Sequence, residues 1–427
     1  MTPSIYNCTV KLGTLEILYN TITNKHIILS NEVKDCLNGS SVNANLLLQL
    51  KNQNFLIEED IDEKRLVETL FLQRRYSSRS YQLILNTTLD CNLCCWYCYE
   101  NHVAKSFMSI DVVNRILKHL ELKLKSDHFE ILELSFFGGE PMMNYKAIAA
   151  LLQGVQILAE EYTFKIYLLF VTNGTLISDS YINLLKHFQT RFQITIDGDK
   201  NSHNIARKYK LNVGNHDSYS QIIKGLQTLN SACDKFHFTI RINYDNNVLK
   251  NIPQLISDID FLNRKRTAIS LQRIWQHEES DIDTEILMEA VNYINEQRFV
   301  INTFYPTSNF HSCYADNYNQ AIINYNGDVY KCTARDFSSE RSLGYLNSLG
   351  IIEWDTNEIK KRLSLTIPVK CRNCKLLPSC PGICSQKLSE NKLTDEISCP
   401  YSKGLNENDI ILLNIKQQLI ARKNENI

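Results

Sequence analysis

Cysteine spacing limits what this chain can fold into more than any other feature of its sequence. The 427 residues include 14 cysteines, and 11 of these fall into two groups, one around residue 95 and one after residue 312. The start of the chain has no basic stretch followed by an apolar one, so we predict a cytoplasmic protein without a secretion signal. In a reducing compartment, grouped cysteines bind metal or carry out redox chemistry more often than they form disulfides. The two groups therefore predict metal centres.

The first group lies on one short segment directly after a predicted strand. Cys91, Cys95 and Cys98 are separated by three and then by two residues. Three thiolates on one loop can bind three corners of a cubic iron–sulfur cluster and leave the fourth iron without a protein ligand. The spacing alone leaves two alternatives open. One is a zinc site with His102 as a fourth ligand, and the other is a ligand set that uses Cys94 in place of Cys95.

Strands and helices alternate through the middle of the chain. Apolar residues at helical spacing fill several gaps between the predicted strands, at residues 112–120 and 148–158. Repeated β-then-α units favour a parallel sheet with helical crossovers, although the pattern cannot distinguish an open sheet from a barrel. The six predicted strands are Gln82–Leu85, Ile131–Phe137, Lys165–Val171, Phe192–Ile196, Phe236–Asn243 and Ala268–Arg273.

A different pattern precedes this region. Leu15–Tyr19 and His26–Leu29 predict a hairpin, and two helices are predicted after it, near Asn31–Leu37 and Val42–Asn54. Ser30 and Ser41 are the candidate N-caps of these two helices. We therefore predict three domains: a small α+β domain at 1–80, an α/β domain at 81–300 and a cysteine-rich domain at 301–427 that ends in a helix near residues 409–423.

The second cysteine group forms a long pattern around Gly327. Seven thiolates exceed the needs of one tetrahedral site and indicate two metal centres. A pair of zinc ions, with His311 completing the second site, is the alternative that the residues leave open. The seven cysteines are Cys313, Cys332, Cys371, Cys374, Cys380, Cys384 and Cys399.

The first group and several later motifs together resemble the radical SAM superfamily. Cys91-x3-Cys95-x2-Cys98 has the superfamily's spacing, with an aromatic residue before the last cysteine, and Gly138–Pro141 resembles its GGEP motif. The resemblance implies that the three cysteines are catalytic and hold a [4Fe–4S] cluster whose open iron chelates S-adenosylmethionine. In this alignment Cys94 is not a ligand, and Glu140 can accept hydrogen bonds from a ligand ammonium. The residues expected to bind the cofactor are Tyr97, Gly138, Gly139, Glu140, Thr172, Asn173, Thr195, Asp197, Arg207 and Asn243.

The second group resembles the seven-cysteine SPASM domain. This implies an α/β fold with a partial (β/α)6 radical SAM barrel, the small N-terminal domain and a C-terminal iron–sulfur domain, with three [4Fe–4S] clusters in all. By the resemblance, Cys371, Cys374, Cys380 and Cys399 bind one auxiliary cluster, and Cys313, Cys332 and Cys384 bind the other. The second of these sets has three cysteines, which predicts a vacant iron able to take a substrate thiolate. The remaining Cys8, Cys36, Cys94 and Cys233 are expected to be small buried residues.

Enzymes with this layout generate a 5′-deoxyadenosyl radical and mostly act on peptides or proteins. The first 80 residues also resemble, weakly, the winged-helix elements that recognise leader peptides. We therefore predict a maturase that forms a thioether or C–C crosslink in a ribosomally made precursor peptide, with an electron donor such as flavodoxin or ferredoxin. An anaerobic sulfatase-maturing enzyme, which forms formylglycine, and a non-catalytic zinc-binding scaffold are the alternatives.

Composition agrees with this prediction. Lysine and arginine number 46 against 47 aspartate and glutamate, and the formal net charge of −1 does not favour a nucleic-acid partner. No apolar run approaches the roughly 20 residues of a membrane span, so no membrane partner is expected.

Overall fold

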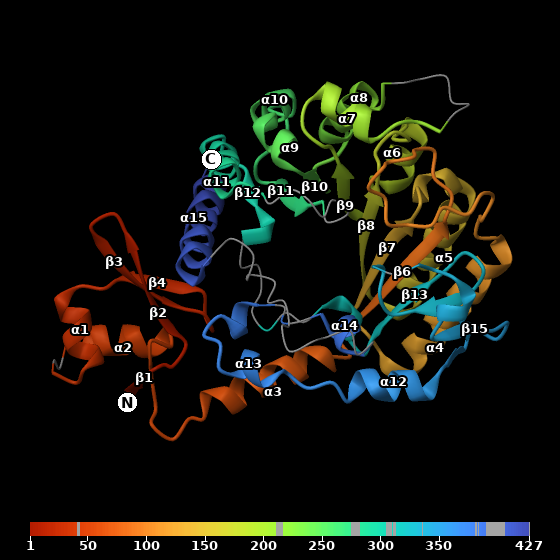
Figure 1. Cartoon of the computed structure of the whole chain (residues 1–427). Coiled ribbons are helices and arrows are strands. Elements are labelled where there is room, and N and C mark those ends of the chain that lie inside the picture. Colours follow the sequence, from red (N-terminus) through yellow and green to blue (C-terminus); the bar gives the residue numbers. More distant parts are fainter. Residues whose placement is uncertain are drawn as a thin grey trace. The chain divides into compact units, whose positions relative to one another are not determined.

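The chain is described here from a computed structural model (Figure 1). The structure describes residues 1–40, 43–210, 217–274, 282–304, 310, 313–334, 336–380, 382, 384–389 and 406–426. It divides into two compact units. The first unit contains residues 1–77, 304–318 and 360–422, and the second contains residues 78–303, 319–359 and 423–427. The cysteine-rich segment after residue 301 therefore contributes to both units, which its sequence pattern did not indicate.

The second unit is organised around one large sheet. Seven strands run parallel from β13 through β11 in the order β13-β6-β7-β8-β9-β10-β11, and short strands extend both edges. All six strands predicted from the alternating pattern are present, which confirms the α/β parallel architecture. These strands are β6 (Ser80–Thr88), β7 (Ile131–Gly138), β8 (Lys165–Thr172), β9 (Gln189–Thr195), β10 (Phe236–Tyr244) and β11 (Thr267–Arg273). The short strands are β12 (Val300–Ile301), β13 (Gln320–Ile323), β14 (Asp328–Tyr330), β15 (Gly344–Leu346) and β16 (Ile352–Trp354).

Helices connect the parallel strands and lie along the outer side of the sheet (Figure 1). In α4 and α5, the apolar stripe predicted from helical spacing is the buried face. Side-chain caps start the helices: Ser109 accepts from Val112 N at the start of α4, and Asn144 accepts from Ala147 N at the start of α5. The main helices of this unit are α4 (Ile110–Asp127), α5 (Tyr145–Tyr162), α6 (Asp179–Leu185), α7 (Lys200–Ala206), α8 (Ser218–Ala232), α9 (Asn246–Lys250), α10 (Ile252–Asp258) and α11 (Thr284–Glu296).

A row of aromatic rings crosses four of the parallel strands. Phe136, Phe170, Phe192 and Phe238 occupy paired register positions on β7, β8, β9 and β10. Neighbouring ring centroids are 4.5, 5.7 and 6.3 Å apart, and all four rings are at most 2% exposed. Because each ring contacts the next across a strand boundary, this row fixes the register of the strands whose ends carry the site residues.

The first unit begins with β1 (Thr2–Pro3), which pairs with β5 (Leu56–Ile57), and its main elements are a three-stranded antiparallel sheet and the three helices that follow it. The predicted hairpin is present as β3 (Leu15–Asn20) and β4 (Lys25–Ile28), and β2 (Asn7–Leu12), which was not predicted, pairs with β3. The helix α1 (Asn31–Leu37) has the predicted bounds and the predicted cap, since Ser30 accepts from Val33 N. The next helix, α2 (Ala44–Asn52), is capped by Asn43, whereas the predicted cap Ser41 lies outside the described residues. The third helix is α3 (Glu63–Arg75).

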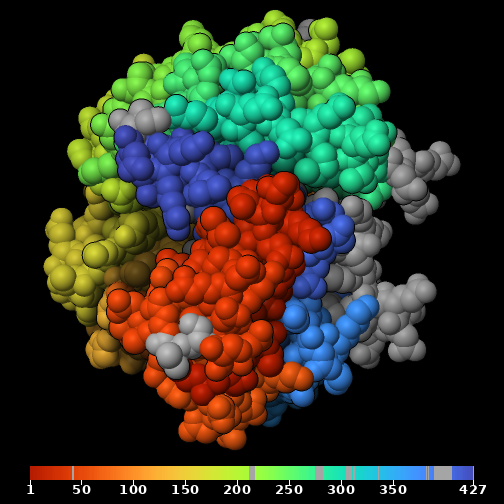
Figure 2. All heavy atoms as spheres, turned by 90° about the vertical axis from the view of Figure 1, so that its left-hand side faces the viewer, coloured from red at the N-terminus to blue at the C-terminus, as the bar shows by residue number. Residues whose placement is uncertain are grey.

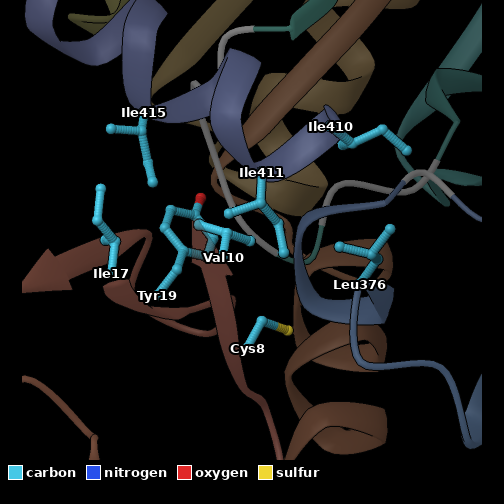
Figure 3. Packing of buried hydrophobic residues seen from close by; sticks show 8 residues of the cluster. All are labelled: Cys8, Val10, Ile17, Tyr19, Leu376, Ile410, Ile411 and Ile415. Atoms are coloured by element: carbon cyan, nitrogen blue, oxygen red, sulfur yellow. The ribbon is translucent and has the colours of Figure 1, made fainter. Parts of the chain in front are cut away.

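The N-terminal sheet shares a hydrophobic core with the C-terminal part of the same unit (Figure 3). Tyr19 and Val10 from the sheet pack against Ile411 and Ile415 of α15 (Glu407–Glu425) and against Leu376. Figure 2 shows the N-terminal residues as one continuous red and orange surface bordered by the blue helix α15. The core therefore joins segments that lie about 400 residues apart in the sequence.

The cysteine-rich segment of the first unit is built from short helices and tight turns. Its elements are α12 (Thr356–Leu363), which begins in the second unit, α13 (Val369–Arg372), η5 (Leu377–Ser379) and α14 (Ser385–Ser389). Among the described helices of the whole chain, none is both long and apolar enough to cross a membrane.

Candidate active site

The loop that follows β6 carries the first cysteine group and is fixed to a second backbone segment. Cys94 N donates to Lys208 O at 2.8 Å, Lys210 N donates to Asn92 O at 3.1 Å, and Leu93 forms an isolated antiparallel bridge with Tyr209. Leu93 is fully buried and packs with Cys91, Cys95 and Tyr209. These contacts hold the loop in place through its backbone and one buried leucine, so the cysteine side chains are left available for ligands.

The three predicted cluster ligands line one pocket. Cys91, Cys95 and Cys98 surround a cavity of about 140 Å³ that lies at the carboxyl ends of the parallel strands, which is where such sheets place their sites. Cys94 does not line it, and its thiol lies 3.5 Å from the carbonyl oxygens of Lys208 and Tyr209. This placement supports the alignment in which Cys94 is not a ligand, although Cys94 is exposed rather than buried as expected. Eight of the ten predicted cofactor-binding residues also line the cavity: Tyr97, Gly138, Gly139, Thr172, Asn173, Thr195, Arg207 and Asn243.

Burial keeps these thiols protonated in the metal-free chain. It raises the pKa of the Cys91 thiol to about 12 and that of Cys95 to about 11, and it also raises the pKa of Cys98. Only thiolates bind iron, so binding here releases protons. Within the described residues, no three Cys, His, Asp or Glu side chains converge as ligands of a single metal ion. The three thiols of a cubane site need not converge on one ion, because each of them binds a different iron atom.

The two glycines of the GGEP segment let the end of β7 approach the cysteine loop. A Cβ at Gly138 would lie 2.2 Å from Thr88 O, and a Cβ at Gly139 would lie 2.2 Å from Asp90 O. Gly139 N donates to Thr88 O at 3.0 Å, and Glu140 N donates to Asp90 O at 2.8 Å. Any other residue would push the loop away from the strand. The glycines therefore position the cysteine loop as well as lining the cavity.

Glu140 does not reach the cavity. Its carboxylate is fully buried, and it accepts hydrogen bonds from Met142 N at 3.0 Å, from the Thr172 hydroxyl at 2.7 Å and from Asn173 N at 2.7 Å. The expectation that Glu140 accepts from a ligand ammonium is thus not what this arrangement shows. Instead, the carboxylate ties the segment after β7 to the end of β8, because it accepts from Met142 in the turn after β7 and from Thr172 and Asn173 at the end of β8.

Asp197 also lies behind the cavity wall, where it belongs to a buried polar network. The Tyr97 hydroxyl donates to Asp197, and it accepts from Arg207 Nη1 at 2.8 Å and from Asn243 Nδ2 at 3.3 Å. Asp197 also accepts from Asn243 N at 2.8 Å. Burial raises the pKa of Tyr97 well above its ordinary value, so its hydroxyl remains a donor. The network links the cysteine loop to the ends of β9 and β10.

Some buried polar atoms at the cavity have no partner in the part of the chain that the structure describes. These atoms are Arg207 Nε and both carboxylate oxygens of Glu100, and both residues line the cavity. S-adenosylmethionine carries a carboxylate, an amino group and a sulfonium, so a site offering a guanidinium and a carboxylate beside three thiols fits it. Burial raises the pKa of Glu100 to about 9. We did not predict Glu100 from the sequence; its only signal was an acidic residue two positions after Cys98.

The second cysteine group is only partly placed. Cys371, Cys374 and Cys380 lie on consecutive turns of the first unit, in which Cys374 N donates to Cys371 O at 3.0 Å and Cys380 N donates to Leu377 O at 3.1 Å. Their predicted fourth ligand, Cys399, and the alternative zinc ligand His311 lie outside the described residues. The other predicted set takes Cys313 and Cys384 from the first unit and Cys332 from the second. Both auxiliary clusters stay predictions.

Comparison with known proteins supports the resemblance that the motifs around Cys91 indicate. Residues 85–248 match the Radical SAM superfamily. A cysteine-type anaerobic sulfatase-maturating enzyme of Clostridium novyi is 23% identical over 386 residues, covering 79% of this chain and 97% of the enzyme. The radical SAM cyclopropyl synthase TigE of Paramaledivibacter caminithermalis is 23% identical over 410 residues, covering 89% and 82%.

One solved structure is similar in fold over nearly the whole chain. SuiB of Streptococcus suis, bound to its precursor peptide SuiA, aligns with a TM-score of 0.52 and 17% identity, covering 95% of this chain and 100% of that one. The superfamily and the sequence relatives are SAM-dependent enzymes, so the alternative of a non-catalytic zinc scaffold is wrong. Residues 85–248, which include the loop of Cys91, Cys95 and Cys98 and the strand ends around it, are therefore a radical SAM domain.

Proposed function

We propose that this enzyme is a maturase that forms a thioether or C–C crosslink in a ribosomally made precursor peptide. The observation that carries the proposal is the N-terminal arrangement of a three-stranded sheet followed by three helices, ahead of the radical SAM domain. SuiB and TigE, one bound to a precursor peptide and one named a cyclopropyl synthase, match 95% and 89% of this chain. The sulfatase-maturating enzyme matches 79% of it.

In this proposal the cavity residues hold the cofactors and exclude water. Cys91, Cys95 and Cys98 hold a [4Fe–4S] cluster, and Arg207 and Thr195 hold S-adenosylmethionine beside it. When bound, these two groups supply a carbon-centred radical that abstracts a hydrogen atom from the substrate. Arg207 is buried, and its Tyr97 contact fixes the direction of its guanidinium, so the residue can orient an anionic group without rearrangement. An external protein of the flavodoxin or ferredoxin class would supply the electron that this chemistry needs.

The N-terminal sheet is the proposed leader-peptide site. Among the described strands, β4 pairs with β3 alone, which leaves one of its edges able to accept an added strand. Ile28 on β4 is 55% exposed, and Leu12 and Leu15 on β2 and β3 are 49% and 46% exposed. A leader peptide that adds a strand at the β4 edge would bury apolar side chains of its own against Ile28.

The auxiliary clusters complete the proposal. Cys371, Cys374, Cys380 and Cys399 would hold one cluster, and Cys313, Cys332 and Cys384 the other. With three cysteines, the latter would keep one iron open to a substrate thiolate. Mössbauer spectra of the anaerobic enzyme, recorded with and without a cysteine-containing substrate, test this. A spectrum that substrate leaves unchanged would count against an open iron.

The substrate assignment is tested by searching for a short reading frame beside this gene and using the peptide that it encodes. Anaerobic incubation of that peptide with enzyme, reductant and S-adenosylmethionine should yield 5′-deoxyadenosine and a peptide that has lost two hydrogens. Removing the leader segment of the peptide should abolish modification while leaving the slow cleavage of the cofactor unchanged. Formation of deoxyadenosine with no change in the peptide would show that the substrate assignment is wrong.

Sulfatase maturation is the second candidate, because the match to the Clostridium novyi enzyme extends over 97% of that protein. The same assay distinguishes the two functions when a sulfatase-derived peptide with a target cysteine replaces the precursor. Conversion of that cysteine to an aldehyde would establish formylglycine formation and rule out crosslinking as the main activity.

A further inference from the structure

Glu100 lines the cavity, and its carboxylate oxygens have no hydrogen-bond partner among the described residues. It lies two residues after Cys98 and lines the cavity together with Tyr97, Arg207 and Asn243. Both of its carboxylate oxygens are buried, and neither has a hydrogen-bond partner in the described part of the chain. A buried carboxylate without a partner destabilises a fold, because it loses its hydration and gains no replacement. A residue of this kind on the loop that holds the cluster suggests that its partner arrives with a ligand.

Other carboxylates near the cavity have their hydrogen bonds within the protein. Glu140 accepts three hydrogen bonds from the protein and does not line the cavity. Asp197 accepts from Tyr97 and Asn243 and also lies behind the wall. Asp90, on the same loop as Glu100, accepts from Lys210 Nζ at 2.7 Å and from two backbone amides. Glu100 therefore differs from these three in having an acceptor group that is not already used.

We infer that Glu100 is a further cofactor-binding residue, whose carboxylate accepts a hydrogen bond from, or pairs with the positive charge of, S-adenosylmethionine. The cofactor offers amino, ribose-hydroxyl and sulfonium groups close to the cluster. Arg207 then offers hydrogen-bond donors and Glu100 an unused acceptor to a ligand that carries groups of both kinds. The inference rests on the radical SAM assignment and does not depend on the peptide substrate.

The test measures ligand affinity rather than turnover. Glu100→Gln, Glu100→Ala and Glu100→Asp variants are reconstituted anaerobically, and the dissociation constants of S-adenosylmethionine and S-adenosylhomocysteine are measured by equilibrium dialysis. We expect Glu100→Ala to weaken S-adenosylmethionine binding about tenfold or more, with partial recovery in Glu100→Asp. Equal losses for both ligands would assign the contact to an amino or hydroxyl group, and a loss confined to S-adenosylmethionine would assign it to the sulfonium charge.

Two controls separate ligand binding from a structural role. Iron content and the electron paramagnetic resonance spectrum of the reduced, cofactor-free cluster should match those of the wild-type enzyme. Asp90→Asn removes a carboxylate from the same loop that already has protein partners, and it should leave both dissociation constants within about twofold of wild type. Unchanged affinities in all three Glu100 variants, or an equal loss in Asp90→Asn, would overturn the inference.

Discussion

A single hydroxyl group joins three elements at this site. Tyr97 belongs to the cysteine loop, Asp197 follows β9, and Asn243 lies near the end of β10, so the hydrogen bonds of the Tyr97 hydroxyl hold the loop against two strand ends. Phenylalanine at this position would keep the aromatic ring and lose only these contacts.

Tyr97→Phe should therefore weaken S-adenosylmethionine binding by roughly tenfold and lower the free energy of unfolding by about 1–3 kcal/mol, because Asp197 and Arg207 lose a buried partner. Equilibrium dialysis and urea unfolding of the reconstituted enzyme measure the two effects. Tyr167→Phe, at a ring that is 43% exposed, is the matched control and should change neither. Wild-type affinity in Tyr97→Phe would remove the hydroxyl from the cofactor site.

At the scale of residues, the sequence predicted which groups line the cavity better than it predicted what each group does. The spacing of Cys91, Cys95 and Cys98 is local, and a local pattern identifies ligands on one loop. The role of Glu140 depends on hydrogen-bond donors at the end of β8. The lack of hydrogen-bond partners at Glu100 depends on its burial. Both are set by tertiary contacts, which the order of residues does not show.

Among the elements, the aromatic row across β7 to β10 is the most sensitive part of the sheet. Phe192→Ala should lower the free energy of unfolding by about 3–5 kcal/mol, because it leaves a cavity between Phe170 and Phe238. Ile157→Ala on α5, at a side chain that is 60% exposed, is the control and should cost less than about 0.5 kcal/mol. Urea unfolding at fixed pH provides the comparison, and equal effects would contradict the proposed packing role of the row.

The contact of α4 with β6 and the β15–β16 turn predicts a dependence of stability on pH. His119 Nδ1 donates to Gly350 O at 2.9 Å, and the Tyr81 hydroxyl donates to His119 Nε2 at 2.7 Å, so the ring is neutral in the fold. Burial lowers the pKa of His119 to about 4 from an ordinary value of 6.5. The unfolded chain therefore binds the proton first as the pH falls.

The stability that neutral His119 contributes should be complete above pH 6.5 and should be lost as the pH falls toward 4, by up to about 3 kcal/mol. His119→Gln, which retains a donor and an acceptor but does not titrate, should flatten that part of the pH profile. The measurement is the free energy of unfolding at several pH values for both proteins. Parallel profiles would show that other groups cause the dependence.

Element prediction succeeded where apolar runs were long and failed where strands were short. The six parallel strands have seven to nine residues each, and their buried faces give a clear pattern. The strands β12, β14, β15 and β16 have only two or three residues, too few for a periodicity to be seen. Likewise β2 carries exposed polar residues beside its buried ones and was missed.

For the whole molecule, the shared core of the first unit predicts that the N-terminal residues are not a removable appendage. Val10 and Tyr19 cover Ile411, Ile415 and Leu376, so deleting residues 1–77 would expose an apolar face. We expect the truncated enzyme to aggregate and to lose iron from the auxiliary site that includes Cys371 and Cys374. Size-exclusion chromatography and iron analysis test this.

Two single substitutions in the full-length chain provide the control. Val10→Asp, at a side chain that is 1% exposed, should reproduce the effect of the deletion, whereas Leu12→Asp on the same strand, where the side chain is 49% exposed, should not. A monodisperse truncated enzyme with full iron content would contradict the shared core. The sequence could not predict this core, because its two halves are separated by the whole radical SAM domain.

Lys375 and Thr21 strengthen the same junction. The Thr21 hydroxyl donates to Lys375 O at 2.6 Å, and Lys375 Nζ donates to Asn7 O at 3.1 Å, immediately beside Cys374. Engineers who wish to redirect this enzyme by exchanging its front end with that of a relative should therefore graft three stretches at once: residues 1–77, 371–380 and 407–415. A chimera that contains only the first stretch would pack the sheet of one enzyme against the core residues of another. Loss of activity in such a chimera would give no information about which peptides the donor enzyme accepts.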